Sequence, residues 1–212
     1  MKKLLYLYIF VSILFSCSSY VRITYFSLVS IPEVKKCQEV IGEKIGVENF
    51  SAPPVLNRQE IICRKGNMNG LKFFSHKLWW GLPQEMITEF LKNYLIKKNL
   101  FSSVLSHPSS YESVNYFIAG IVKQFELHCK TEQEWESVVS LQIFLVQAQN
   151  GKIIWDSGII KESTKCKPSF NEASAAMTKS VQKIFKKVLE QLKILLVQNG
   201  LNKHILVMPK HK

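Results

Sequence analysis

Residues 137–160, SVVSLQIFLVQAQNGKIIWDSGII, decide the fold of this chain. Val139, Leu141, Ile143 and Leu145 alternate with other residues, which is the pattern of a strand that buries one face. Asn150-Gly151 is the strongest short hairpin signal a sequence can carry. The stretch therefore predicts a strand over 137–147 that turns back into a second strand over 152–160. Residues 115–127, NYFIAGIVKQFEL, predict the strand before them, so that the three form an antiparallel meander.

The segments around this meander predict further strands and two helices. Pro83 stands where helices favour proline, and helical apolar spacing follows it over residues 82–99. Ser169 and Glu172 resemble a capping box that begins a second helix, over 169–198. Shorter β-branched or aromatic segments predict the remaining strands, over residues 21–30, 44–50, 59–64, 71–74 and 101–105. The expected fold is an α+β two-layer sandwich, in which two amphipathic helices cover one face of a mainly antiparallel sheet.

The amino-terminal residues predict an exported protein. Two lysines precede thirteen largely apolar residues, which suits a bacterial export signal and is too short to span a bilayer. Leu14-Phe15-Ser16-Cys17 resembles the lipobox of bacterial lipoproteins, which implies removal of residues 1–16 and lipidation of Cys17. The alternative is an ordinary secretory signal with an incidental cysteine. The serines after Cys17, where aspartate favours the inner membrane, resemble a signal for the outer membrane.

These features divide the chain into four parts. Residues 1–16 are the expected signal peptide, and residues 17–20 are a lipidated tether. Residues 21–198 form a single α+β domain, and residues 199–212 form a basic tail. Several acyl chains anchor a protein stably, because each buried CH₂ contributes about 0.8 kcal/mol. A tether this short keeps the domain within roughly 20 Å of the lipid.

The net charge of +12 comes almost entirely from lysine, with arginine only at positions 22, 58 and 64. Bidentate recognition of phosphate or bases favours arginine, so we expect no nucleic-acid partner. Lysines near an anionic leaflet gain attraction of up to ~1 kcal/mol each. The alternative is that the lysines are simply solvated.

The sequence does not assemble an enzyme. Asp156 is its one aspartate, and it lies beside a predicted strand in Trp-Asp-Ser-Gly. The five histidines form no HExxH motif, and no Cys-x-x-Cys or phosphate-binding glycine loop occurs. Glu132, Glu134 and Glu136 alternate around Trp135, which favours a solvated loop over a catalytic carboxylate pair. We expect no catalytic residue, no metal site and no cofactor.

Cysteines and tryptophans supply the remaining candidate residues. Outside the cytoplasm the cysteines other than Cys17 can oxidise. Cys129 and Cys166 follow the first and third strands of the meander, and we predict a disulfide between them; the alternatives are free thiols or a Cys37–Cys63 bridge. Adjacent tryptophans point in different directions, so one of Trp79 and Trp80 is expected to pack inward. The other either completes the core packing or forms part of a lipid- or partner-contacting patch.

The order of several short segments resembles a known family. After the lipobox come Tyr25-Phe26-Ser27-Leu28, Ile45-Gly46-Val47 with Phe50, and Ala52-Pro53-Pro54-Val55-Leu56. Next come residues 61–64 and 71–74, a tryptophan before a helix, Leu100-Phe101, residues 116–125 with Gly120, and Trp135. The chain thereby resembles the ABC-type transport auxiliary lipoproteins, the PqiC-like lipoproteins of intermembrane lipid transport. It departs from them at Pro54-Val55-Leu56 and in its extra cysteines.

The resemblance implies a non-enzymatic part of a phospholipid-transport system across the bacterial envelope. The implied partners are a mammalian-cell-entry-type substrate-binding protein and an ABC permease complex. The implied location is the periplasmic face of the outer membrane, in some cases as a homo-oligomeric ring. The alternatives are an envelope assembly factor, a cell-wall synthase activator or a surface-displayed binding lipoprotein.

Overall fold

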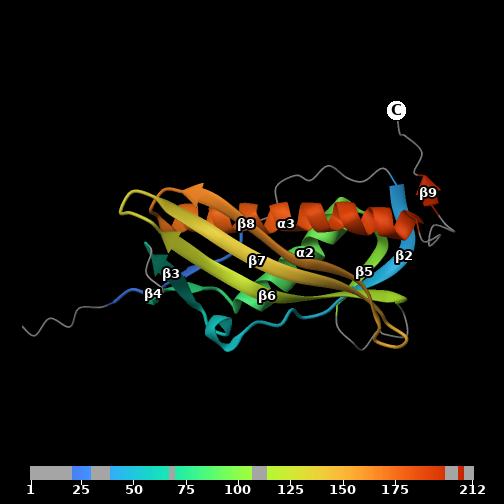
Figure 1. Cartoon of the computed structure of the whole chain (residues 1–212), viewed down its shortest axis with the longest axis horizontal. Helices are drawn as coiled ribbons and strands as arrows, with labels where there is room; N and C mark the ends of the chain where they lie inside the picture. Colours follow the sequence, from blue (N-terminus) through green and yellow to red (C-terminus); the bar gives the residue numbers. More distant parts are fainter. Residues whose placement is uncertain (1–20, 30–38, 67–69, 107–113, 199–204, 208–212) are drawn as a thin grey trace, which may run out of the picture.

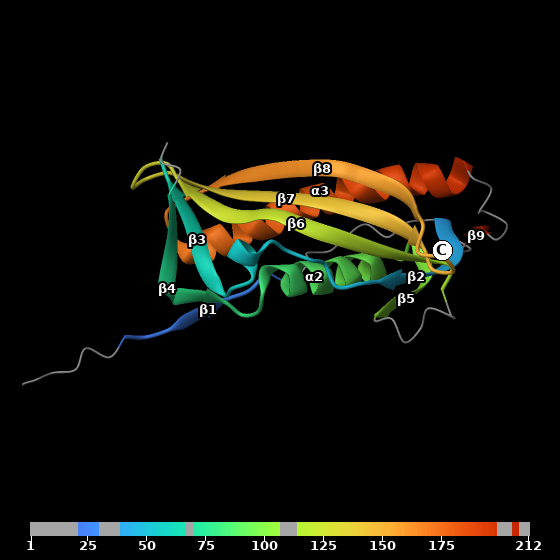
Figure 2. The same cartoon turned by 60° about the horizontal axis from the view of Figure 1, so that its bottom comes forward.

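The computed structural model of the chain describes residues 21–29, 39–66, 70–106, 114–198 and 205–207. The expected signal peptide, the tether with Cys17, and Cys37 lie outside these residues. No helix of the described part is long and apolar enough to cross a membrane. Figures 1 and 2 show long, curved strands with helices packed against them.

The predicted meander forms as β6 (Tyr116–Cys129), β7 (Trp135–Gln147) and β8 (Ile153–Cys166). Antiparallel pairing of β6 with β7 runs from Tyr116↔Gln147 to Cys129↔Trp135. The turn at Asn150-Gly151 places Gly151 at φ 68°, in the left-handed region that glycine enters readily. The meander and its hairpin are therefore confirmed.

The other edge of β6 is shared by two strands that are far from it in sequence. β2 (Glu39–Val47) pairs parallel with the start of β6, and β3 (Glu60–Lys65) pairs parallel with its end. Between them, Ser51 donates its backbone N–H to the Gly120 carbonyl at 2.9 Å and bridges to Ile121. The chain after β2 thus closes the gap that β2 and β3 leave along β6.

The remaining elements extend this sheet. β4 (Leu71–Trp79) forms an antiparallel hairpin with β3, and the short β1 (Thr24–Phe26) adds parallel to β4. β5 (Phe101–Ser106) pairs parallel with β2, and β9 (Ile205–Val207), inside the predicted tail, pairs antiparallel with β2. A 3₁₀ helix, η1, spans Pro54–Leu56. The sheet is mixed, with four parallel strand pairs that the sequence did not predict.

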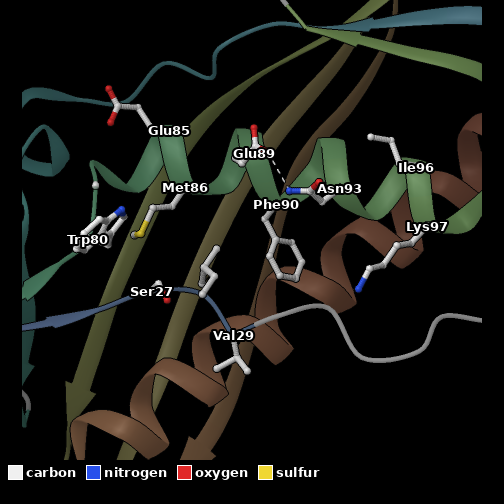
Figure 3. A pocket seen from close by; sticks show the side chains of 12 residues that line it. Ser27, Val29, Trp80, Glu85, Met86, Glu89, Phe90, Asn93, Ile96 and Lys97 are labelled. Atoms are coloured by element: carbon white, nitrogen blue, oxygen red, sulfur yellow. Dashed lines mark hydrogen bonds between the residues drawn. The ribbon is translucent and has the colours of Figure 1, made fainter.

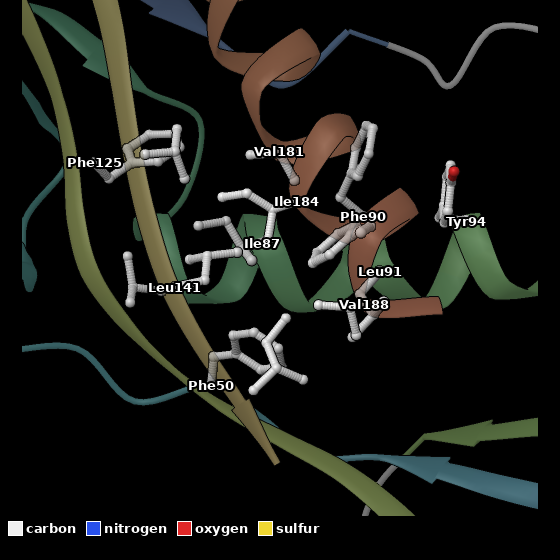
Figure 4. Close-up of a cluster of buried hydrophobic side chains, with 14 of the residues drawn as sticks. Phe50, Ile87, Phe90, Leu91, Tyr94, Phe125, Leu141, Val181, Ile184 and Val188 are labelled. Atoms are coloured by element: carbon white, nitrogen blue, oxygen red, sulfur yellow. The ribbon is translucent and has the colours of Figure 1, made fainter. Parts of the chain in front are cut away.

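Two helices complete the α+β fold, α2 (Pro83–Lys98) and α3 (Phe170–Gln198). α3 contacts β7 and β8, and α2 contacts β5 and β6. The helices meet where the Phe185 ring lies 6.2 Å from Phe90 and 6.1 Å from Tyr94. Figure 4 shows the apolar side chains that converge there. The α+β class is confirmed, while the placement of both helices on one face stays a prediction.

A tight contact in this core joins Gly120 of β6 to Phe50. A Cβ atom built on Gly120 would lie 2.4 Å from the nearest atom of the Phe50 ring, a distance that real Cβ atoms essentially never show. Phe50 is itself buried, and its backbone N–H donates to Thr88 Oγ1 of α2 at 2.9 Å. Glycine is needed at position 120 because the Phe50 ring occupies the space that any other side chain at this position would fill.

The predicted Cys129–Cys166 disulfide is wrong. Trp135 of β7 pairs with Cys129 on one side and with Cys166 on the other. The two cysteines are therefore separated by two strand spacings, roughly 9.5 Å, beyond the ~7 Å that a disulfide spans. Cys129 is instead bonded to Cys63 of the neighbouring β3, with 6.2 Å between their Cα atoms, and Cys166 is free. The alternative Cys37–Cys63 bridge is excluded as well.

Candidate functional site

A groove of about 710 Å³ lies between α2 and the segment that follows β1 (Figure 3). Apolar side chains dominate its lining, and charged residues of α2 join them at Glu85, Glu89 and Lys97. The apolar lining residues are Leu28, Val29, Trp80, Met86, Phe90 and Ile96. A mainly apolar groove of this size, with polar side chains among its lining, is typical of a binding site.

The two adjacent tryptophans have opposite environments. Trp79, the last residue of β4, is 1% exposed and packs on Phe125 with 5.1 Å between ring centroids. Trp80 faces the other way because successive side chains of an extended chain alternate, and it is 72% exposed. One of the pair packs inward, as predicted. The other is a groove residue rather than a second core residue.

Trp80 is held in place at the mouth of the groove. Its backbone N–H donates to the Phe26 carbonyl at 2.7 Å, and Gln59 Nε2 donates to the Trp80 carbonyl at 3.2 Å. Its ring meets Tyr25 edge to face, with centroids 5.9 Å apart. An exposed aromatic ring with a fixed backbone suits a contact surface, because little conformational freedom is lost when a partner binds.

The other wall of the groove is fixed by α3. Val29 donates its backbone N–H to Thr178 Oγ1 at 2.9 Å, and Ser174 Oγ donates to the Ser27 carbonyl. Residues 27–29 are thereby tied to one helix and face the other. The groove is part of the packed fold.

α2 presents one side to the core and another to the groove. Ile87, Leu91 and Leu95 are buried, whereas Met86 lines the groove. On the groove side, Lys92 and Asn93 donate to the Glu89 carboxylate at 2.8 and 2.9 Å. The hydrogen bond from Lys92 lowers the pKa of Glu89, so this carboxylate is charged at neutral pH.

Exposed apolar residues continue from Trp80 along the start of the domain. Val21, Ile23 and Tyr25 alternate along the chain that leads into β1, and each is about half exposed. With Trp80 they form what we call the N-terminal apolar patch. Contiguous exposed apolar surface marks protein or membrane contacts in soluble folds. The sequence had assigned residues 21–30 to a strand, and did not identify this patch.

The carboxylates that the sequence singled out have structural partners. Asp156 accepts the backbone N–H of Gly158 at 2.8 Å and the side-chain amide of Gln142 at 2.9 Å. Glu134 pairs with Lys165 at 2.9 Å, and Glu136 pairs with Lys130 at 2.7 Å. Within the described ranges, no three His, Cys, Asp or Glu side chains are grouped so as to hold a metal ion.

A buried charged cluster on β6 was missed by the sequence analysis. Glu126 is only 4% exposed and receives two hydrogen bonds from Arg64 of β3, at 3.0 and 3.2 Å. Gln124 Nε2 lies 2.7 Å and His128 Nε2 lies 2.9 Å from the same carboxylate. The alternation Gln124, Glu126, His128 along a predicted strand is the signal that could have revealed the cluster. It links β3 to β6 on the opposite face of β6 from Phe125.

This cluster predicts a specific pH dependence of stability. Burial raises the pKa of Glu126, but hydrogen bonds from Arg64, His128 and Gln124 outweigh it and hold the pKa below the ordinary 4.5. The stabilisation that ionised Glu126 contributes is complete above the pKa that this residue has in the unfolded chain. It is lost as the pH falls through the lower pKa of Glu126 in the folded protein. The free energy of unfolding, measured with urea from pH 7 to pH 3, should therefore fall on the acid side. In Glu126→Gln this fall, the acid limb of the profile, should be smaller. At pH 7 the variant should also lose about 1–3 kcal/mol, since Arg64 loses its charged acceptor.

The exposed Glu190→Gln on α3 is the matched control, and it should keep the wild-type profile. An unchanged acid limb in Glu126→Gln would show that the cluster does not contribute to acid stability.

The described fold is similar to solved structures. Protein XCC0632 from Xanthomonas campestris, whose description carries the family designation DUF330, aligns with a TM-score of 0.65 at 12% identity. The alignment covers 85% of this chain and 98% of that one. A second, uncharacterized protein aligns with a TM-score of 0.60 at 13% identity, over 81% of this chain and 99% of that one. Lipoprotein GNA1162 from Neisseria meningitidis aligns at 12% identity over 70% of this chain and 99% of that one, with a TM-score of 0.30.

No protein-family model and no curated protein sequence matches this chain. The alignments with TM-scores of 0.65 and 0.60 show that the chain has the fold of XCC0632.

Proposed function

We propose that this protein is a lipid-anchored, non-enzymatic auxiliary component of a phospholipid-transport system in the bacterial envelope. Its place would be the periplasmic face of the outer membrane. The observation that carries the proposal is the position of the N-terminal apolar patch. The patch begins at Val21, four residues after the lipobox cysteine, so that apolar surface and anchor share one end of the domain.

The segments that resemble the transport auxiliary lipoproteins have defined places in this fold, which supports the proposal. Phe50 packs on Gly120, and Trp79 packs on Phe125. The order of segments thus corresponds to contacts in the core. Because the chain has this order of segments and the fold of XCC0632, we assign to it the role of the transport auxiliary lipoproteins.

The groove is the docking surface in this proposal. It combines a fixed, exposed aromatic ring with a mainly apolar lining that charged residues of α2 border, which are properties of protein contact surfaces. The partner would be a mammalian-cell-entry-type protein that works with an ABC permease complex. Several copies of the lipoprotein could surround such a partner as a ring.

Affinity purification from envelopes tests this role. The tagged full-length protein, extracted in mild detergent, should recover a mammalian-cell-entry-type protein and its permease. Trp80→Ser should reduce this recovery at least fivefold without unfolding the domain, because the side chain is largely exposed. Recovery would be quantified by mass spectrometry.

The matched control is Ile159→Ser, which removes a similarly exposed apolar side chain from β8. It should leave recovery unchanged. Repeated failure to recover the transport proteins would contradict the proposal. Recovery of cell-wall synthases or assembly machinery would identify the alternative role, and removal of the domain by protease on intact cells would identify a surface binder.

A further inference from the structure

A second pocket, of about 640 Å³, opens at the far end of β4 from Trp80. β3 and β6 end there, at Lys65 and Cys129, and β7 begins there, at Trp135. We call it the end pocket. None of its lining residues lines the groove described above.

The floor of the end pocket is apolar and aromatic. Phe74 and Trp135 both line it, and both pack on Phe170 of α3, with ring centroids 5.0 and 5.3 Å from the Phe170 ring. The Cys63–Cys129 disulfide forms part of the lining beside them. The disulfide and the shared contact with Phe170 fix the floor, so that the pocket needs little reorganisation to accept an apolar group.

The rim of the end pocket is cationic. Lys65, Lys72 and Lys130 line it, against one carboxylate, Glu132. Lys72 Nζ lies 5.0 Å from the centre of the Phe74 ring, so it bridges the rim and the floor. Lys130 also pairs with Glu136 at 2.7 Å, which leaves Lys65 and Lys72 as the main cationic contribution. Cations above an aromatic floor match a ligand with an anionic head and an apolar body.

We infer that the end pocket binds an amphipathic anion, a phosphate monoester or diester that carries acyl chains. The choice of a lipid as the source of this phosphate rests on the proposed function, whereas the preference for an anionic amphiphile follows from the pocket alone. Lysine suits such a ligand because it contacts phosphate as a point charge and needs no fixed orientation of the head group. The ring floor receives the first part of the chains, and the remainder extends past the mouth of the pocket.

Titration calorimetry with short-chain lipids tests this inference. The protein would be the chain from Ser18 onward, which keeps every residue that the structure describes. Dihexanoyl phosphatidic acid below its micelle concentration should bind. Dihexanoyl phosphatidylcholine, with the same chains and no net charge, should bind about tenfold more weakly, and inorganic phosphate should bind more weakly still. Added salt should weaken the binding of the phosphatidic acid.

Paired variants locate the site. Lys65→Gln with Lys72→Gln should weaken binding of the phosphatidic acid about tenfold. Both side chains are exposed, so the fold should persist. The matched control is Lys123→Gln with Lys161→Gln, which removes two exposed lysines from β6 and β8 outside the pocket and should leave the affinity unchanged.

Three results would overturn the inference. Equal affinity for phosphatidylcholine would show that the rim does not select an anion. Inorganic phosphate as strong as phosphatidic acid would show that a free phosphate, and not a lipid, is the ligand. Unchanged affinity in the Lys65→Gln, Lys72→Gln variant would place the binding elsewhere. Each of these readouts is independent of whether a mammalian-cell-entry-type protein is recovered from envelopes.

Discussion

Replacing Gly120 with alanine should lower the free energy of unfolding by about 3 kcal/mol, at the upper end of the range for overpacked cores. The added methyl group would lie 2.4 Å from the Phe50 ring, and this ring is itself buried in the core. The backbone of Phe50 is fixed by its own N–H, which donates to Thr88 Oγ1 at 2.9 Å. The next residue, Ser51, donates its N–H to the Gly120 carbonyl at 2.9 Å and accepts the N–H of Val122 at 2.8 Å. Chemical denaturation of the purified protein, monitored by circular dichroism, would measure the loss.

Two further variants make this prediction specific. Gly70→Ala is the matched control, because Gly70 has no positive φ and a Cβ there meets nothing within 4 Å. It should change stability by no more than about 0.5 kcal/mol. Phe50→Leu removes Cε2 and Cζ, the two ring atoms nearest to the added methyl group, so the double variant Phe50→Leu, Gly120→Ala should be more stable than the sum of the single changes predicts. A loss in Gly120→Ala as small as that in Gly70→Ala would contradict the contact.

Cys17→Ala should move nearly all of the protein from the membrane fraction to the soluble fraction. Each buried CH₂ of the acyl chains contributes about 0.8 kcal/mol, and a protein with several chains stays anchored whereas one without them does not. The N-terminal apolar patch consists of four partly exposed side chains and cannot replace such an anchor. Fractionation of envelopes after a high-salt wash, followed by immunoblotting, would measure the change.

Cys166→Ala is the matched control for this experiment. Cys166 is a free thiol inside the fold, where burial raises its pKa, and its loss should leave the protein on the membrane. Intact-mass measurement of the Cys17→Ala protein would show whether residues 1–16 have been removed. A leader-free variant that remains with salt-washed membranes would disprove lipid anchoring through Cys17.

Local sequence signals predicted the local part of the fold. The Asn150-Gly151 turn, the alternation in residues 137–147 and the proline at position 83 each act through neighbouring residues, and the structure confirms each element. β8 extends to Cys166, six residues past its predicted end at Ile160. Its polar final residues carry no strand pattern, and they are extended because β7 offers partners as far as Trp135.

Pairing between distant segments could not be predicted from the sequence. The parallel addition of β3 to β6 brings Cys63 to Cys129 across 66 residues, and no local pattern encodes it. Without that pairing, Cys166 was the nearest cysteine to Cys129 along the meander, which explains the wrong disulfide. The groove and the end pocket depend on the same long-range pairings. The sequence therefore identified Trp79 and Trp80 as a pair, while their separate environments required the tertiary structure.

β2 and β3 both pair with the same edge of β6, which constrains the order in which the polypeptide can fold. β2 ends at Val47 and β3 ends at Lys65, yet the strand that both need begins only at Tyr116. β3 can pair with β4 and β2 with β5 before that point, but β2 and β3 are brought into one sheet only when β6 is present. A polypeptide that ends before residue 116 lacks the strand that joins β2 to β3, so we expect it to form these hairpins and pairs without the continuous sheet.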